Sequence, residues 1–169
     1  MLKIQYASGL AGKLSLLKPK GDVLALLGNC GSQYEIKKIA GKWDKVFIIP
    51  TSKDTFDSFN SKNVHVMIQR EYMYEGITFL GAPITGSNYI REEDIGFFYN
   101  ILNSAGNKVV CMSCSAPTTG LLLKSQMLNK KILWLNGEGC KTTTVGRNVF
   151  VGSNNYLSKG FSDEWLTGI

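Results

Sequence analysis

The chain has 169 residues, of which 44% are hydrophobic and 11% aromatic, and its formal net charge is +6. This composition excludes an intrinsically disordered protein, because it supplies enough apolar surface for a buried core. No apolar run approaches the roughly 18 residues of a membrane-spanning helix. The first residues lack the charged start, apolar stretch and cleavage site of a secretion signal. We therefore expect a protein that is intracellular, or packaged into a particle from inside a cell, and that has no membrane span.

The positive charge is spread along the chain, with no run of five or more basic residues. Blocks of that kind mark dedicated nucleic-acid or membrane-binding tails. Aromatic residues are also not interleaved with the lysines as they are in proteins that bind single-stranded nucleic acid. The pattern indicates a surface mildly attractive to nucleic acid or to another acidic surface, and it gives nucleic acid only weak support as a partner.

The N-terminal third alternates short apolar runs with a helical pattern. Residues 4–7, 23–27 and 46–49 are compact apolar runs, and each is followed by Ser, Gly or Pro. Such runs are typical of strands that are buried on both faces. Residues 33–43 place apolar side chains at near-helical spacing, with lysines between them. The order predicts a βαβ unit and hence a parallel sheet.

The rest of the chain continues in the same manner. Further strands are predicted at 64–68, 77–80, 109–112, 132–135 and 149–151. Helices are predicted at 91–102 and 119–128. No internal repeat or low-complexity linker interrupts the pattern, so we expect one domain over residues 1–169. The fold class is α/β, with either two sheets or one large mixed sheet covered by helices.

The four cysteines do not form a recognisable zinc or redox motif. Cys111 and Cys114 make a C-x-x-C pair, but it lies in and just after an apolar strand-like run and not at a helix start. Cys30 and Cys140 are isolated, whereas a four-cysteine zinc site normally brings two close pairs. Free buried thiols are therefore favoured over zinc or redox chemistry.

Five segments occur in a fixed order, and each follows or ends a predicted strand: Lys3–Ala11, Leu27–Asn29, Ile48–Pro50, Ser113–Pro117 and Leu135–Cys140. In order and spacing they resemble the motif segments of a calcineurin-like metallophosphoesterase. That family carries Asp-x-His, Gly-Asp, Gly-Asn-His, a His before Ala-Pro, and Gly-His-x-His in these segments. The resemblance covers about residues 2–160. It implies a two-sheet α/β sandwich flanked by helices, with the family's metal site at the carboxyl ends of the strands.

The first three segments have lost the family's ligands. By the resemblance, the first aspartate falls on Gly9 and its companion histidine on Ala11. The bridging aspartate falls on Asn29, which keeps the shape of aspartate without its charge. The Gly-Asn-His segment becomes Thr51-Ser52-Lys53, which puts a cation where a ligand and a catalytic histidine are expected.

The last two segments are altered as well. The histidine before Ala-Pro falls on Cys114 or Ser115, and Gly-His-x-His becomes Gly137-Glu138-Gly139-Cys140. A two-metal phosphoesterase site needs several carboxylate and imidazole ligands, one of them bridging. The remaining Asn29, Cys114, Glu138 and Cys140 could hold one soft ion but cannot rebuild that pair. The resemblance thus implies a member without metal, cofactor or phosphoesterase activity.

No other catalytic group replaces the lost ligands. The single histidine, His65, lies in an alternating strand away from the motifs and is interpreted as structural or exposed. Cys114 beside Lys53 or Ser115 is the best candidate nucleophile, but it lacks a histidine base. The Gly-rich stretches 28–32 and 81–87 do not have phosphate-loop spacing and are interpreted as tight turns.

A fold whose strand cores and turn glycines are retained while its ligands are lost is predicted to be kept for its shape. Compact family members of this kind look similar to proteins encoded by large DNA viruses. The resemblance therefore implies a structural or scaffolding protein that binds other protein subunits, such as a minor capsid protein or other virion component. The alternatives are a phosphate- or nucleotide-binding pseudoenzyme and a residual phosphoesterase. The candidates for exposed interface residues, each with ordinary core packing as the alternative, are Tyr72, Met73, Tyr74, Phe161, Trp165 and Leu166.

Overall fold

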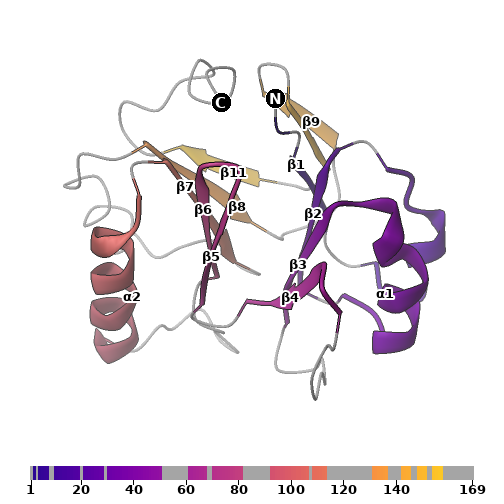
Figure 1. The fold of residues 1–169 in the computed structure, drawn as a ribbon, viewed down its shortest axis with the longest axis horizontal. Helices are drawn as coiled ribbons and strands as arrows, with labels where there is room; N and C mark the ends of the chain where they lie inside the picture. Colours follow the sequence, from indigo (N-terminus) through magenta and orange to yellow (C-terminus); the bar gives the residue numbers. More distant parts are fainter. Residues whose placement is uncertain are drawn as a thin grey trace.

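The chain folds into layers of sheets and helices (Figure 1). In this computed structural model the described residues are 2, 4–7, 10–19, 21–28, 30–50, 61–67, 70–81, 92–106, 108–113, 131–136, 142–145, 148–151 and 154–157. Their mixture of strands and helices confirms the α/β class. The strands form two main sheets and one small hairpin, which decides between the two arrangements that the sequence left open.

Sheet A is parallel throughout and follows the chain in order. Its strands are β1 (Ile4–Ala7), β2 (Val23–Leu27), β3 (Lys45–Ile49) and β4 (Val64–Val66). Every neighbouring pair is parallel, as the predicted βαβ unit requires. The first three strands match the predicted runs closely, whereas β4 ends two residues earlier than predicted.

Sheet B has the order β11-β8-β7-β6-β5. Its strands are β5 (Glu71–Tyr74), β6 (Ile77–Gly81), β7 (Lys108–Ser113), β8 (Lys131–Asn136) and β11 (Asn154–Leu157). The three central strands are parallel, and the two edge strands are antiparallel to their neighbours. A separate hairpin, β9 (Thr142–Val145) with β10 (Asn148–Val151), lies beside β1.

Strand β5 was not predicted from the sequence. It pairs with β6 through a tight turn at Glu75 and Gly76, both of which have positive φ (53° and 76°). Positive φ at both central positions matches the twist of a two-residue hairpin. Glycine adopts this conformation freely, but glutamate is an unusual choice for it, so the sequence carried only half of the usual turn signal.

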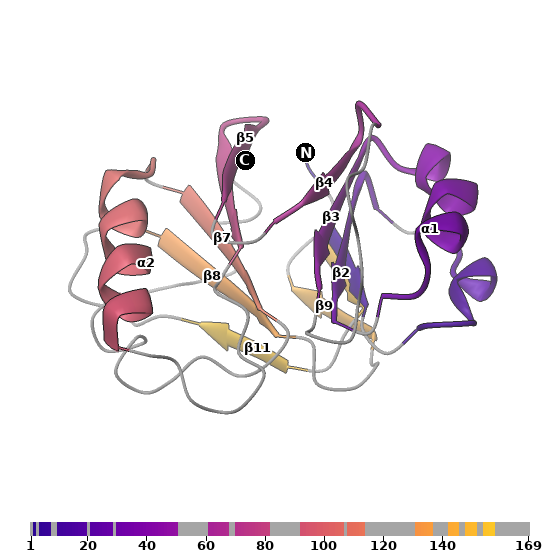
Figure 2. The same ribbon diagram turned by 90° about the horizontal axis from the view of Figure 1, so that it is seen from below.

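Helices cover the outer faces of both sheets. Helix α1 (Gln33–Ile39) with the short 3₁₀ helices η1 (Leu14–Leu16) and η2 (Ala40–Lys42) lies outside sheet A, and α2 (Glu92–Ser104) lies outside sheet B (Figure 2). The predicted helices 33–43 and 91–102 are confirmed, and the predicted helix 119–128 falls outside the described residues. Among the described helices, none is long and apolar enough to cross a bilayer.

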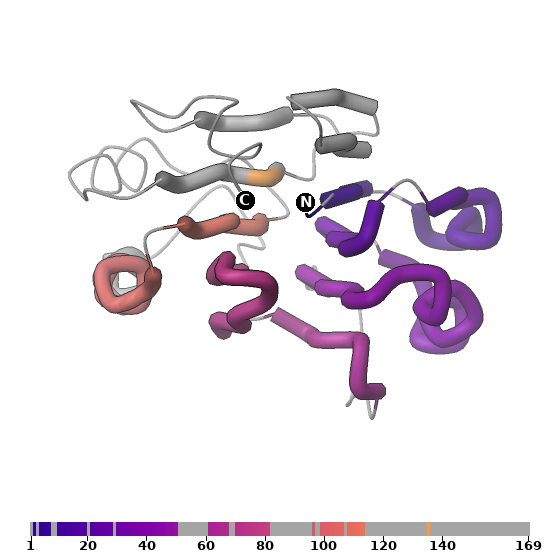
Figure 3. Tube along the Cα trace, turned by 45° about the horizontal axis from the view of Figure 1, so that its top comes forward, coloured from indigo at the N-terminus to yellow at the C-terminus, as the bar shows by residue number. Residues whose placement is uncertain are grey.

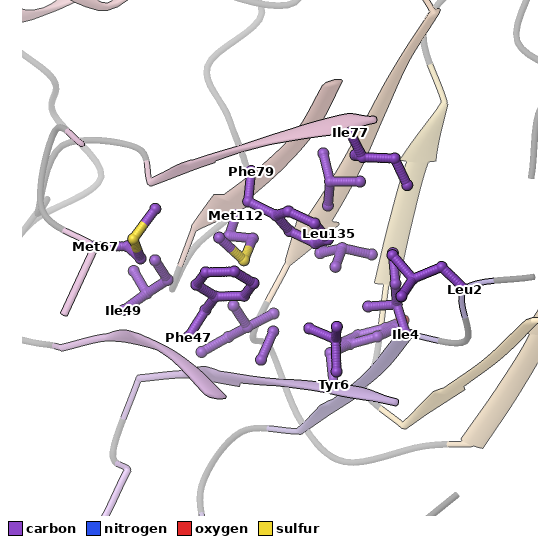
Figure 4. Close-up of a cluster of buried hydrophobic side chains, with 14 residues drawn as sticks. Leu2, Ile4, Tyr6, Phe47, Ile49, Met67, Ile77, Phe79, Met112 and Leu135 are labelled. Carbon is purple, nitrogen blue, oxygen red and sulfur yellow. The ribbon is translucent and has the colours of Figure 1, made fainter. Parts of the chain in front are cut away.

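The main core lies between the two sheets (Figure 4). Alternate residues of sheet A point inward, and the register aligns them across strands, as in Tyr6 beside Ala25 and Ala25 beside Phe47. From sheet B, Phe79 stacks on Phe47 with ring centroids 4.6 Å apart. This inter-sheet core contains Leu2, Ile4, Tyr6, Val23, Ala25, Leu27, Phe47, Ile49, Met67, Ile77, Phe79, Val110, Met112 and Leu135.

A second core fills the space between sheet A and its helical layer. It is formed by the outward residues of β2 and β3 together with Ile36 and Ile39 of α1. One polar link crosses it: the indole Nε1 of Trp43 donates to Oε1 of buried Gln5 at 2.9 Å. Nε2 of Gln5 in turn donates to the carbonyl of Lys18 at 2.9 Å. Both ends of the buried amide are therefore hydrogen-bonded, as burial of a polar group requires.

Candidate functional site

The parallel strands of both sheets run toward the same end of the sandwich. In Figure 4 the chain passes from Phe47 to Ile49 in sheet A and from Ile77 to Phe79 in sheet B in a common direction. The first motif segment contains β1 and runs past its carboxyl end, and the other four begin within the last two residues of β2, β3, β7 and β8. These strands are parallel neighbours within each sheet, so the topology gathers the strand ends that lead into all five segments at one end. We refer to this end as the strand-end rim.

The edges of the two sheets meet at this rim. The amide of Met67, after β4, donates to the carbonyl of Ile48 at 2.8 Å, and the amide of Gly81, at the end of β6, donates to the carbonyl of Arg70 at 3.0 Å. Gly81 passes so close to Met67 that a Cβ built on it would lie 2.6 Å from the Met67 carbonyl carbon. Only glycine fits this approach, which fixes how the two sheets converge.

Of the predicted metal-site positions, Ala11 alone lies among the described residues. It is exposed in the turn after β1, where the amide of Lys13 donates to the carbonyl of Leu10 at 2.8 Å. The remaining seven positions lie outside the described residues: Gly9, Asn29, Ser52, Lys53, Cys114, Glu138 and Cys140. The structure thus describes the strand ends that lead into these positions. The side chains at the seven positions are known from the sequence alone.

The described groups at the ends of β2 and β3 are packing groups. The amide of Gly28, with φ 82°, donates to the carbonyl of Ile49 at 2.8 Å. The thiol of Cys30 is buried, and its Sγ lies 3.4 Å from the carbonyl of Leu26 and 3.6 Å from that of Ile49, to which it donates. A thiol held in this way is a small hydrophobe with a weak donor, and it is not exposed for chemistry.

The end of β7 is equally buried. Cys111 has no exposed surface, and burial strongly raises the pKa of its thiol. The thiolate is the reactive form, so a buried thiol with a raised pKa is a poor nucleophile at neutral pH. The interpretation of the cysteines as free buried thiols is confirmed for Cys30 and Cys111. Cys114 and Cys140 fall outside the described residues.

The Gly-rich turn between β2 and α1 is closed by its own helix. The side chain of Ser32 accepts from the amide of Glu35 at 3.1 Å, and the carboxylate of Glu35 accepts from the amide of Ser32 at 2.8 Å. This capping box satisfies two amides at the start of α1 and places a negative charge there. Gly31, with φ 93°, gives the left-handed bend that brings Glu35 back to the turn. The predicted tight turn is confirmed here, and its charge opposes an incoming phosphate.

The single histidine lies on β4, between the sheets' edges. Its ring lies tilted against that of Tyr72, with 4.2 Å between centroids, and 5.8 Å from that of Phe47. Nε2 of His65 is buried, and no hydrogen-bond partner reaches it from the part of the chain that the structure describes. Burial, and then the charge of Lys45, lower the pKa of His65 below its usual 6.5. The ring is therefore neutral at neutral pH and serves as an aromatic surface, as the structural interpretation expected.

The cluster of side chains around His65 was not predicted from the sequence. The ammonium of Lys45 lies 5.4 Å above the Tyr72 ring and 5.7 Å above the Tyr74 ring. Both tyrosines are half-buried against the inter-sheet core. Of the interface candidates Tyr72, Met73 and Tyr74, the two tyrosines therefore follow the alternative of core packing, because the alternation of β5 turns them inward and leaves Met73 outward, 69% exposed. A two-residue period in this segment was the signal that could have shown this.

The other predicted interface residues, Phe161, Trp165 and Leu166, lie outside the described residues. Within the described part of the chain, no three His, Cys, Asp or Glu side chains come together as candidate metal ligands. A comparison with known protein families and with curated proteins finds no match for this chain. The resemblance to metallophosphoesterases therefore rests on the five motif segments, and the activity and partners it implies are taken up below as proposals.

Proposed function

We propose that this chain is a non-catalytic protein of metallophosphoesterase-like fold that acts as a structural or scaffolding component through contacts with other protein subunits. The observation that carries the proposal is the position of His65. It is the chain's only histidine, and it packs tilted against Tyr72 with a neutral ring and a buried Nε2. A phosphoesterase of this type relies on several histidines as ligands and catalytic groups.

The chemistry of the motif segments supports the same conclusion. Parallel strands that end at one rim are where an α/β protein of this kind assembles a site. Where the resemblance expects metal ligands, the segments that follow these strands carry in sequence a glycine, an amide, a lysine and one carboxylate: Gly9, Asn29, Lys53 and Glu138. A pair of divalent cations needs bridging negative charge, and a lysine among the ligands opposes it.

The specific form of the proposal is a minor capsid protein or other virion component, which rests on the resemblance to compact proteins of large DNA viruses. Two sheets packed through an apolar core and covered by helices would give such a component a rigid body. Its contacts with neighbouring subunits would then lie on the outer layers of the fold.

The alternative of a phosphate- or nucleotide-binding pseudoenzyme is an outcome of the tests. The turn before α1 gives it no support, because Glu35 and Ser32 occupy the amides that would face a phosphate. A thermal-shift series with ATP, GTP and inorganic phosphate checks it. We expect no change in Tm, and stabilisation that saturates with nucleotide would favour the alternative.

Catalysis is tested by metal analysis of the purified full chain together with turnover of bis(p-nitrophenyl) phosphate in added Mn²⁺. We expect neither bound metal in stoichiometric amount nor turnover above the background rate. The matched control is His65→Phe, which keeps an aromatic ring on β4. Stoichiometric Mn, Fe or Zn accompanied by turnover would overturn the proposal, and loss of that turnover in His65→Phe would assign the histidine to catalysis.

The structural role itself is tested on the native protein, purified from its source without denaturation. Quantitative mass spectrometry should find the chain in an assembly, at a fixed ratio to other protein subunits. Recovery as a free monomer from every fraction would contradict a scaffolding role.

A further inference from the structure

The helical layer outside sheet A carries a concentrated positive charge. Residues 10–19 and 33–42, which contain η1 and α1, hold five lysines and a single acid, Glu35, in a chain of net charge +6. All five lysines are exposed, and we call this surface the lysine face: Lys13, Lys18, Lys37, Lys38 and Lys42. The carboxylate of Glu35 accepts the Ser32 amide in the capping box, so it is committed to the helix start.

Two large apolar side chains stand out from the same layer. Leu16 on η1 is 75% exposed and Tyr34 on α1 is 67% exposed. Their neighbours Leu14 and Ile36 are fully buried, so each element already has an apolar residue that fixes it to the sheet. Figures 2 and 3 show η1 and α1 side by side, so the two exposed apolar residues belong to neighbouring elements of one layer. Leu16 and Tyr34 are therefore available for contact with another molecule.

The Tyr34 ring is held in place by a lysine of the same face. Tyr34 and Lys38 are four residues apart on α1, and the Lys38 ammonium lies 4.3 Å from the ring centroid. A cation over one ring face fixes the ring against the helix and leaves the outer side free. Ordering the ring in advance lowers the entropy that binding would otherwise cost.

We propose that the lysine face docks an acidic protein segment whose apolar side chains pack on Leu16 and Tyr34. The inference rests on the proposed scaffolding function and names the chemistry of the partner. The lysines supply long-range attraction and a polar rim, and the two apolar residues supply contact area at the centre.

A protein segment fits this surface better than a nucleic acid does. Neither segment contains an arginine, the residue that most often grips phosphates and base edges in two places at once. Tyr34 offers a single free ring face and Leu16 offers no ring, so these two residues do not form the series of aromatic platforms on which successive bases stack. An exposed leucine contributes to affinity only when an apolar partner covers it, because the driving force scales with apolar area removed from water.

The probe is a short fluorescein-labelled peptide in which glutamates alternate with leucine and phenylalanine, titrated against the full chain by fluorescence anisotropy. Replacing Lys37 and Lys38 together by glutamate should weaken binding about tenfold or more, since two attractive charges become repulsive. The matched control is Arg70→Glu, an exposed position between β4 and β5, which should change the affinity less than about twofold. Leu16→Ser should weaken binding without changing its salt dependence, because it removes contact area only.

Several outcomes would overturn the inference. These are the absence of peptide binding, equal weakening by Arg70→Glu and the Lys37/Lys38 pair, or binding that survives replacement of the peptide's glutamates by glutamine. Tighter binding to a DNA duplex or to phosphatidylserine vesicles than to the peptide would reassign the face to nucleic acid or membrane. Far-ultraviolet circular dichroism checks folding, and a Lys37→Gln/Lys38→Gln variant replaces the charge-reversed one if it unfolds.

The outcome of the peptide-binding test can be distinguished from the outcome of the metal and turnover tests of the proposed function. If the peptide fails to bind while the chain still shows neither metal nor turnover, the lysine face is refuted and the non-catalytic proposal stands. If the chain hydrolyses a phosphodiester, the proposed function fails whatever the peptide does.

Discussion

Replacing Gly81 by alanine is the sharpest test of how the two sheets are joined. The residue ends β6 at the strand-end rim, where the edge of sheet B meets the residue that follows β4. Its φ lies outside the left-handed range, so alanine can adopt the same backbone conformation. Any cost of the substitution must therefore come from the space around the new Cβ.

That space is occupied by main chain. A Cβ on Gly81 would lie 2.6 Å from the carbonyl carbon of Met67 and 2.8 Å from the Met67 Cβ, inside the 3.0 Å that real Cβ atoms respect. Met67 is tied to Ile48 and Gly81 to Arg70 by backbone hydrogen bonds, so relief requires moving a strand end. Overpacking of this kind costs about 1–3 kcal/mol, and a rigid neighbour puts the cost near 3 kcal/mol.

The lower entropy of the unfolded alanine chain offsets about 0.4–1 kcal/mol, which leaves a net loss of about 2 kcal/mol. The matched control is Gly96→Ala in α2, where nothing lies within 4 Å of the added Cβ. That change should stabilise by up to about 1 kcal/mol, because alanine is the better helix former. Urea unfolding followed by tryptophan fluorescence measures both variants. A Gly81→Ala protein as stable as the control would refute the close approach of the two sheets.

Three further predictions concern stability and reactivity. Because the folded pKa of His65 lies below 6.5, stability should be full above that pH and fall as pH drops toward the folded value, with a slope below about 1.4 kcal/mol per pH unit; urea unfolding between pH 5 and 8 should show a flatter profile for His65→Phe. Ser32→Ala removes the capping side chain of α1 and should cost about 1 kcal/mol in the same assay, whereas an unchanged midpoint would argue against the capping box. Cys30 and Cys111 should resist iodoacetamide in the native protein and react in urea, because both are buried and burial raises the pKa of Cys111; mass spectrometry locates the adducts, and rapid native labelling of either would contradict its packing.

The sequence predicted best those elements whose own residues decide their structure. Val23–Leu27 and Val46–Ile49 are apolar and buried on both faces, so a short uninterrupted run was sufficient to identify them as central strands. β5 was missed because its turn uses Glu75 at positive φ, a position where sequence rules look for glycine or asparagine. A local sequence pattern identifies a turn only when the turn contains the residues usually found at its positions.

The candidate site shows a different limit. The strand ends that lead into the motif segments could be predicted, since each apolar run is followed by serine, glycine, proline or asparagine. The environment of His65 could not be predicted, because its two partners come from different sheets. Phe47 lies in sheet A and Tyr72 in sheet B. The charge of Lys45, which helps to hold the ring neutral, reaches it through the same tertiary arrangement.

The order of the strands along the chain also has a consequence during synthesis. Sheet A is finished at Val66, whereas β8, the last parallel strand that covers its inner face, ends at Asn136. Synthesis proceeds at about 5–20 residues per second, so β8 is completed about 4–14 s after sheet A. During that time the strands of sheet A are present but the strands of sheet B that cover its inner face are not all synthesised. Phe47 and Ile49, at the centre of the mature protein, then face water or a chaperone. A ribosome-bound chain stopped once Met67 has left the exit tunnel should therefore bind holdase chaperones, and one stopped after β8 has left the tunnel should release them.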